Sequence, residues 1–105
     1  MVQSETARRG DDWVVVRVNG DLAGQLWTDA IRHTLQDHYV DDGVRCIRLD
    51  VRRLRFLDNF GVATLVVLQR ESQQKGKRLL VEGSQGQVRD KLRMTGVLKL
   101  LERGG

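Results

Sequence analysis

The centre of the chain reads Val44-Arg45-Cys46-Ile47-Arg48-Leu49-Asp50 and then Leu54-Arg55-Phe56-Leu57-Asp58-Asn59-Phe60-Gly61, followed by an apolar run from Val62 to Leu68. This order predicts a strand, a loop and then a helix. The first stretch is rich in residues that suit a buried strand, and Phe56-Leu57 adds a second short apolar element. Asp58 or Asn59 can cap the helix, because a short polar side chain accepts hydrogen bonds from the unpaired N–H groups of the first turn. We call residues 58–62 the corner and expect it to be exposed.

The sequence before this stretch predicts a flexible leader, a strand and a helix. Residues 1–10 are polar and without periodicity, so we expect a flexible leader there and a folded domain over residues 11–103. Residues 13–18 are rich in β-branched types and end at Asn19-Gly20, which predicts a hairpin or a tight bend. From Ala23 to Tyr39 the apolar residues recur at intervals of three and four, as in an amphipathic helix, and residues 41–43 end it.

The sequence after the corner predicts a helix, a strand and two more helices. The helix from Asn59 or Phe60 to about Gln74 has apolar residues on more than one face, so we expect it to be largely buried or shared with a partner. Residues 78–81 predict a strand, Ser84-x-x-Gln87 has the form of a capping box that opens a helix, and a short helix follows to residue 101. This alternation predicts an α/β domain, with a mixed, mostly parallel sheet of about four to five strands and about four helices.

The chain is basic, with 18 Lys and Arg against 14 Asp and Glu, a net charge of +4 and a pI near 9.8. Such a charge raises the question of nucleic-acid binding. Arginines cluster around the central strand, but aspartates are interleaved with them, and few aromatic residues could stack on bases. We therefore expect a solvated, mixed-charge surface and no specific nucleic-acid binding. A basic patch that faces an acidic protein partner is the alternative.

The sequence also bears on location and redox chemistry. No apolar run approaches the roughly 18 to 20 residues that span a bilayer, and the start of the chain lacks the apolar stretch of a secretory signal. We expect a cytoplasmic protein with no membrane insertion. Cys46 is the only cysteine, so no internal disulfide can form, and its apolar neighbours indicate a small buried side chain rather than a reactive thiol.

Residue types that are typical of enzymes do not assemble into a site in this sequence. His33 and His38 are five residues apart, so they do not share a helix face as an i, i+4 metal pair would, and we expect two surface histidines and no metal. Asp50 is interpreted as a strand-end residue and Asp58 as a cap. The phosphate-binding motifs G-x-x-x-x-G-K-[ST] and G-x-G-x-x-G and the nucleophile motif G-x-S-x-G are absent. We expect neither an enzyme activity nor a cofactor.

The corner and the residues before it resemble the central signature of STAS domains, the family of anti-sigma factor antagonists. That signature commonly reads F-x-D-S-S-G, and the matching residues here are Phe56-Leu57-Asp58-Asn59-Phe60-Gly61. The resemblance continues at Gly20-Asp21-Leu22, at Gly76-Lys77-Arg78-Leu79-Leu80-Val81, and at Leu92-Arg93-Met94-Thr95-Gly96-Val97, which is similar to the family's closing L-x-x-x-G-L pattern. It extends from Trp13 to Leu101. In the family, the residue after the aspartate is the serine or threonine that a partner anti-sigma kinase phosphorylates.

Two departures from the family pattern imply that the phosphorylation switch is missing. Asn59 matches the phosphorylated position and has no hydroxyl, and Ala23 matches the Asp of a G-x-L-D motif that many phosphorylatable members have. We hypothesise that the chain binds its partner in a permanently unphosphorylated-like state, through Asp58, Asn59, Phe60, Gly61, Val62, Asp21, Leu22 and Ala23. Without the resemblance, the corner would be interpreted as an ordinary helix start.

The resemblance implies a non-enzymatic regulator that binds an anti-sigma factor, or a related kinase-fold protein, and so frees a sigma factor. The alternative within the same fold is a STAS accessory subunit of a lipid-transport ABC complex, which needs no phosphate acceptor either. A basic nucleic-acid-binding protein is the alternative from another class, and a small-molecule sensor is a further one. The sequence leaves open whether the domain forms a homodimer.

Overall fold

One five-stranded sheet and four helices make up the described part of the chain, which comprises residues 2–24 and 28–104 of a computed structural model. The strands are β1 (Val2–Arg9), β2 (Trp13–Leu22), β3 (Cys46–Asp50), β4 (Leu54–Leu57) and β5 (Arg78–Glu82). The helices are α1 (Thr28–Tyr39), α2 (Asn59–Gln74), α3 (Gly86–Met94) and α4 (Leu98–Arg103). The predicted α/β architecture is therefore confirmed.

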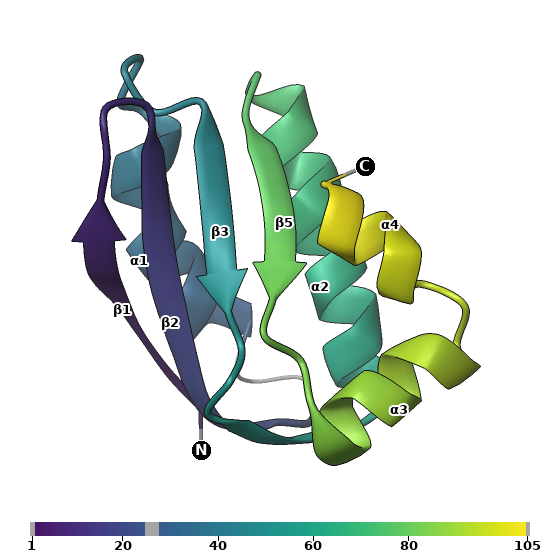
Figure 1. Cartoon of the computed structure of the whole chain (residues 1–105). Helices are drawn as coiled ribbons and strands as arrows, with labels where there is room; N and C mark the ends of the chain where they lie inside the picture. Colours follow the sequence, from purple (N-terminus) through teal and green to yellow (C-terminus); the bar gives the residue numbers. More distant parts are fainter. Residues whose placement is uncertain (1, 25–27, 105) are drawn as a thin grey trace.

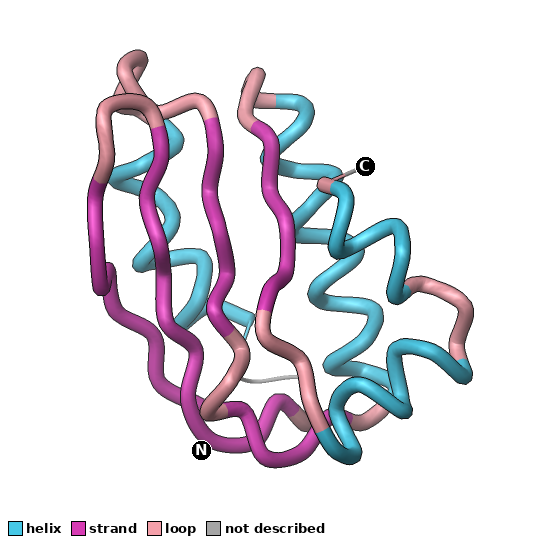
Figure 2. The backbone as a smooth tube through the Cα atoms, viewed as in Figure 1, coloured by secondary structure: helices cyan, strands magenta, loops and turns pink. Residues whose placement is uncertain are grey.

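The sheet is mostly parallel and has the order β1-β2-β3-β5. Strand β2 pairs in parallel with β3 and, further along, with β4, while β3 pairs in parallel with β5 and β1 is antiparallel to β2. In Figure 1, α1 and α2 lie behind the sheet, and α3 and α4 lie beyond β5. Figure 2 shows β4 running along the lower edge, below the ends of β3 and β5. The corner, which follows β4, therefore lies at the edge where the parallel strands end.

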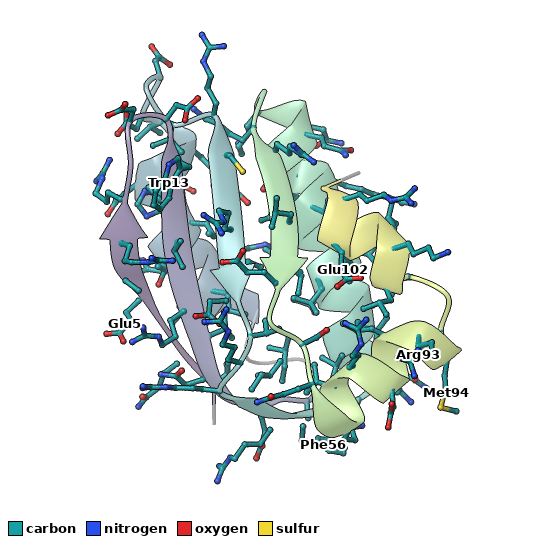
Figure 3. All side chains as sticks on the ribbon, in the orientation of Figure 1. Glu5, Trp13, Phe56, Arg93, Met94 and Glu102 are labelled. Carbon is teal, nitrogen blue, oxygen red and sulfur yellow. The ribbon has the colours of Figure 1, made fainter. Side chains whose placement is uncertain are left out.

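The two faces of the sheet differ in what covers them. Alternate strand residues form the core on the helix side, and each is at most 2% exposed: Val14, Val16, Val18, Ile47, Leu49, Leu79 and Val81. On the other face, Figure 3 shows side chains without a layer of helices over β1, β2 and β3. There the Arg48 guanidinium lies 5.3 Å from the Trp13 ring centroid and 2.9 Å from the Glu82 carboxylate. Long charged side chains thus shield this face.

The flexible leader expected over residues 1–10 is wrong for residues 2–9, which form strand β1. This strand is held to α1 by hydroxyl groups: the Ser4 hydroxyl oxygen lies 2.7 Å from that of Thr34, and the Thr6 hydroxyl oxygen lies 2.7 Å from Nε2 of His38. Because polar side chains make these contacts, the segment shows none of the apolar alternation from which a strand is predicted.

Of the hairpin or tight bend expected at Asn19-Gly20, the hairpin is wrong, because β2 continues through both residues to Leu22. Gly20 has a φ of 97°, which a residue with a side chain rarely adopts, and the pairing of β2 with β4 shifts register between Gly20 and Asp21. The glycine therefore lets the strand bend while it changes partner from β3 to β4. The helix expected from Ala23 begins at Thr28, and residues 25–27 of that prediction lie outside the described residues.

His38 also differs from expectation, since we expected it at the surface and it is buried, with 4% of the residue exposed. Its ring nitrogen Nε2 is hydrogen-bonded to the Thr6 hydroxyl, so it helps to attach β1 to α1. Burial, and after it the positive charge of Arg9, lower the pKa of His38 from the ordinary value of 6.5. The folded chain thus favours the neutral imidazole. His33 is exposed, as expected.

We predict that stability falls as the pH drops below about 6.5, because the unfolded chain then takes up a proton at His38 more readily than the folded chain does. Urea denaturation from about pH 7.5 to about pH 5.5 would measure the free energy of unfolding across this range. A His38→Gln variant, whose amide can still bond to Thr6, should show a weaker pH dependence. An equal dependence in the two proteins would contradict the prediction.

Candidate functional site

The corner is built around Asp58, the last residue before α2, and the predicted cap is confirmed. Its backbone is extended, with φ −100° and ψ −175°, which ends the β4 direction and lets the helix begin at Asn59. One carboxylate oxygen, Oδ1, accepts a hydrogen bond of 2.8 Å from the N–H of Gly61. The other, Oδ2, accepts one of 3.0 Å from the N–H of Gly24, in the segment that follows β2. A single side chain therefore ties the start of α2 to the end of β2.

Gly61 lets the helix approach the strand closely. A Cβ atom at this position would lie 2.2 Å from the backbone carbonyl oxygen of Leu22 and 2.5 Å from the Leu57 side chain. Both distances are far below a normal contact, so no larger residue fits without moving the backbone.

Gln87, in the first turn of α3, forms two hydrogen bonds to Leu57, the residue just before the corner. Its Oε1 accepts a hydrogen bond of 2.9 Å from the N–H of Leu57, and its Nε2 donates one of 2.8 Å to the carbonyl of the same residue. The predicted capping box is therefore wrong, because Gln85 is the N-cap of α3 and no side chain caps that helix. Gln87 instead makes the two bonds that a neighbouring strand would make to β4.

The expected interface residues separate into supporting and exposed ones. Leu22, Gly61 and Val62 are buried, with Leu22 fully covered and Val62 7% exposed, so these residues shape the corner without presenting a surface. Asn59 and Ala23 are exposed, Phe60 is 53% exposed, and Asp21 is partly exposed. Asp58 is partly buried, and both of its oxygens are used by backbone N–H groups. The surface offered to a partner is thus a neutral amide beside a projecting aromatic ring.

Phe56 is a surface residue that the sequence analysis assigned to a strand and not to the site. It is 44% exposed, and Figure 3 labels it at the lower edge of the molecule, next to α3. Its alternation with buried Leu57 could have indicated this, since neighbouring strand residues point to opposite sides. Exposed aromatic residues therefore lie two positions before and two positions after Asp58 in the sequence.

The side chains of the described residues offer little for metal or thiol chemistry. Within residues 2–24 and 28–104, no group of three or more His, Cys, Asp or Glu residues could hold a metal ion. Cys46 is partly buried rather than fully buried as expected, and burial raises the pKa of its thiol. The thiol therefore stays protonated near neutral pH, the less reactive form.

A model of the STAS domain family matches residues 4–103, so this chain belongs to the STAS domain family. The resemblance seen in the sequence is thereby confirmed over nearly the whole chain. No curated protein matches the sequence.

Solved structures of two kinds share the fold. The anti-sigma factor antagonist SpoIIAA in its unphosphorylated form is 22% identical, with a TM-score of 0.72 over 91% of this chain and 83% of that one. The phosphorylated form of the Bacillus cell fate determinant SpoIIAA is 21% identical, with a TM-score of 0.67 over 94% and 87%. The murine anion transporter Slc26a9 is 14% identical, with a TM-score of 0.71 over 93% of this chain and 18% of that one. In the part of the present chain that the structure describes, no helix is long and apolar enough to cross a membrane.

We predict that Asp58→Ala lowers the free energy of unfolding by about 2 kcal/mol, because it removes a helix cap and leaves two N–H groups without their acceptor. Asp58→Asn should lose less, since its one amide oxygen can replace only one of the two carboxylate oxygens. Chemical denaturation of the three proteins would give the order wild type, Asn, Ala. Equal stability of wild type and Asp58→Ala would contradict the bridging role.

Proposed function

We propose that this STAS domain is a non-enzymatic regulator, an anti-sigma factor antagonist that binds an anti-sigma factor or a related kinase-fold protein. Occupation of that protein would free the sigma factor it holds. The observation that carries the proposal is the exposed Phe60 at the start of a helix whose position is fixed by Asp58 and Gly61. Exposed aromatic residues on a rigid base commonly act as anchors of protein interfaces.

The rigidity of the corner supports a docking role because it reduces the entropy lost on binding. Asp58 bonds to backbone N–H groups on two segments, and Gln87 bonds to both backbone groups of Leu57. The residues beneath Phe60 are therefore already ordered in the free domain. A partner that covers the ring would gain its apolar area without ordering a loop.

Asn59 would make this antagonist independent of phosphorylation at the usual position. A phosphate adds about −1.5 to −2 charges and considerable bulk, which would reject a partner that packs against the helix start. An amide side chain cannot accept phosphate. Ala23, which is exposed just after β2, also lacks the carboxylate that the Asp of the family's G-x-L-D motif would supply. Regulation would then act through the amounts of this chain and of its partner.

The accessory subunit of a lipid-transport ABC complex remains the alternative within the fold. The absence of a hydroxyl at Asn59 suits it equally, and the fold is shared with part of an anion transporter, Slc26a9. The neighbouring genes would distinguish these two functions. An anti-sigma kinase gene favours the antagonist, and permease and ATPase genes favour the accessory subunit. A nucleic-acid binder would instead be retained on DNA or RNA in a strongly salt-dependent way.

We predict that Phe60→Asp abolishes capture of the main partner from native lysate, because it places a charge where an apolar contact is needed. Val40→Asp is the matched control. Val40 is 72% exposed and follows α1, at the edge of the sheet opposite the corner. The control should capture the partner as wild type does, and circular dichroism should show both variants folded. Undiminished capture by folded Phe60→Asp would refute the proposed surface.

We also predict that incubation with native lysate and ATP leaves residues 58–64 without stoichiometric phosphate, as measured by mass spectrometry. Asn59 has no hydroxyl. Thr64 is only 6% exposed, and its hydroxyl donates a 2.9 Å hydrogen bond to the Phe60 carbonyl. Asn59→Ser supplies an exposed hydroxyl and shows whether a suitable kinase is present. Stoichiometric phosphate on Thr64 of the wild type would contradict the proposal.

A further inference from the structure

An open hollow lies between the loop that precedes β3 and the loop that precedes β5. Its volume is about 470 Å³, which is within the range of small-molecule sites in proteins. Among the described residues that line it, four are basic, and we call it the basic hollow: Asp42, Val44, Arg45, Lys75, Gly76, Lys77 and Arg78. In Figure 1 both loops are at the top of the molecule, where β3 and β5 begin, whereas β4 is at the bottom. The basic hollow is therefore separate from the corner.

Lys77 distinguishes the basic hollow from a patch of solvated charges. Only 7% of the residue is exposed, and its ammonium Nζ donates hydrogen bonds of 2.6 Å to the backbone carbonyls of Asp41 and Val44. An ammonium group has three N–H donors, so one of them has no acceptor among the described residues. No ion pair involves Lys77 within residues 2–24 and 28–104. Because a charge removed from water is costly without an opposite charge beside it, Lys77 favours an anion nearby.

The other three basic side chains of the hollow are exposed and likewise form no ion pair in the described part of the chain. The Arg78 guanidinium donates to the backbone carbonyl of Arg103, at 3.2 Å from Nε and 2.5 Å from Nη2. The ammonium of Lys75 lies 5.6 Å from the centroid of the Tyr39 ring. A carbonyl or an aromatic ring orients a cation but does not neutralise it. These side chains therefore keep their positive charge at the rim of the hollow.

The carboxylates of the neighbouring loop offset this charge only in part. Asp42 lines the hollow and is exposed. The Asp41 carboxylate is already occupied, since it accepts hydrogen bonds from the Arg9 guanidinium at 3.1 Å and from the Gly43 N–H at 2.9 Å. A ligand entering the hollow thus meets four positive side chains and one negative side chain.

Hydrogen bonds hold the two loops of the basic hollow together. The N–H of Arg78 donates to the carbonyl of Arg45 at 2.8 Å, and the two bonds from the Lys77 ammonium connect the same loops. The N–H of Lys77 also donates to the carbonyl of Ser72 at 2.8 Å, which fixes its loop to the end of α2. The hollow is therefore already formed in the free domain, and a ligand would not have to order it.

We propose that the basic hollow binds a small soluble molecule that carries a phosphate group. A phosphate monoester has about −1.5 to −2 charges near neutral pH and three acceptor oxygens, so one group can accept bonds from several of these cations. A single carboxylate has one charge and would match them less well. A nucleic acid also fits less well, because no aromatic residue is among the described lining residues for a base to stack on. This inference does not depend on the proposed function.

The test is an NMR titration of the isotope-labelled full chain with methyl phosphate, inorganic phosphate and pyrophosphate. We expect the amide signals of Arg45, Lys75 and Gly76, and the ammonium signal of Lys77, to shift along saturable curves with each compound. Sodium chloride at equal ionic strength should not reproduce these shifts. Acetate should bind about tenfold more weakly than methyl phosphate, because it has fewer charges and acceptor oxygens. Vesicles that contain phosphatidic acid test whether a lipid headgroup is bound instead of a soluble phosphate.

Paired variants then locate the binding site. Arg45→Gln with Lys75→Gln removes two exposed charges from the hollow and should weaken the binding of methyl phosphate about tenfold. The matched control is Arg70→Gln with Lys99→Gln, which removes the same charge at two exposed positions that do not line the hollow. The control should keep the affinity within about twofold of wild type. Circular dichroism verifies that all variants are folded.

Saturable binding that only the hollow variant loses would support the proposal. No saturable binding of any soluble phosphate, or shifts that chloride reproduces, would overturn it. Equal losses in the hollow variant and the control would indicate an adventitious ion only and would overturn the site. Binding to phosphatidic acid vesicles without binding of the soluble compounds would overturn the soluble ligand in favour of a lipid headgroup.

Discussion

The carboxylate of Asp58 joins the start of α2 to the segment that follows β2. Its two oxygens accept hydrogen bonds from Gly61, at the start of α2, and from Gly24, after the end of β2. These segments are far apart in the sequence, and backbone N–H groups at a helix start have no partner within the helix. The carboxylate satisfies one of them and fixes the strand end at the same time. Asp58 is therefore a structural residue, and the side chains that it positions are the ones left for binding.

The close approach of Gly61 to Leu22 and the two bonds from Gln87 to Leu57 complete this arrangement. Together with Asp58 they join the sheet edge, α2 and α3 within a few residues of one another. The interior there is backbone against backbone, with little room for side chains to rearrange. Phe60 projects from this base half-exposed, although burying a phenylalanine would ordinarily stabilise the fold. The folding of the single domain does not explain its exposure.

The central part of the fold was predictable because its determinants are local. The strand, the short apolar element and the capped helix between Cys46 and Gln74 follow from periodicity and from the preference of Asp for helix starts. The family resemblance added the importance of the corner. Strand β1 was not predictable in this way, since it depends on contacts of Ser4 and Thr6 with residues of α1 that lie about thirty positions later. A run of polar residues does not indicate contacts with residues far away in the sequence.

Gln87 shows that prediction from a local sequence pattern also fails at the corner. In sequence it completes an S-x-x-Q pattern, and the local interpretation is a capping box. In the structure its amide pairs with Leu57, thirty residues earlier, because β4 has an unpaired side there that needs a donor and an acceptor together. A primary amide supplies both side by side. The residue that completes the corner was thus visible in the sequence, but its partner was not.

The neutrality of Asn59 is a property of one side chain and not of the fold around it. The start of α2 is the positive end of the helix dipole, and its first turn contains no acidic residue. The backbone there would therefore tolerate an anion. Nothing in the geometry excludes a phosphate, and Asn59 itself points to solvent. The scaffold of a phosphorylation switch is therefore retained while its acceptor is absent. The antagonist that we propose would therefore have a binding surface that is always available.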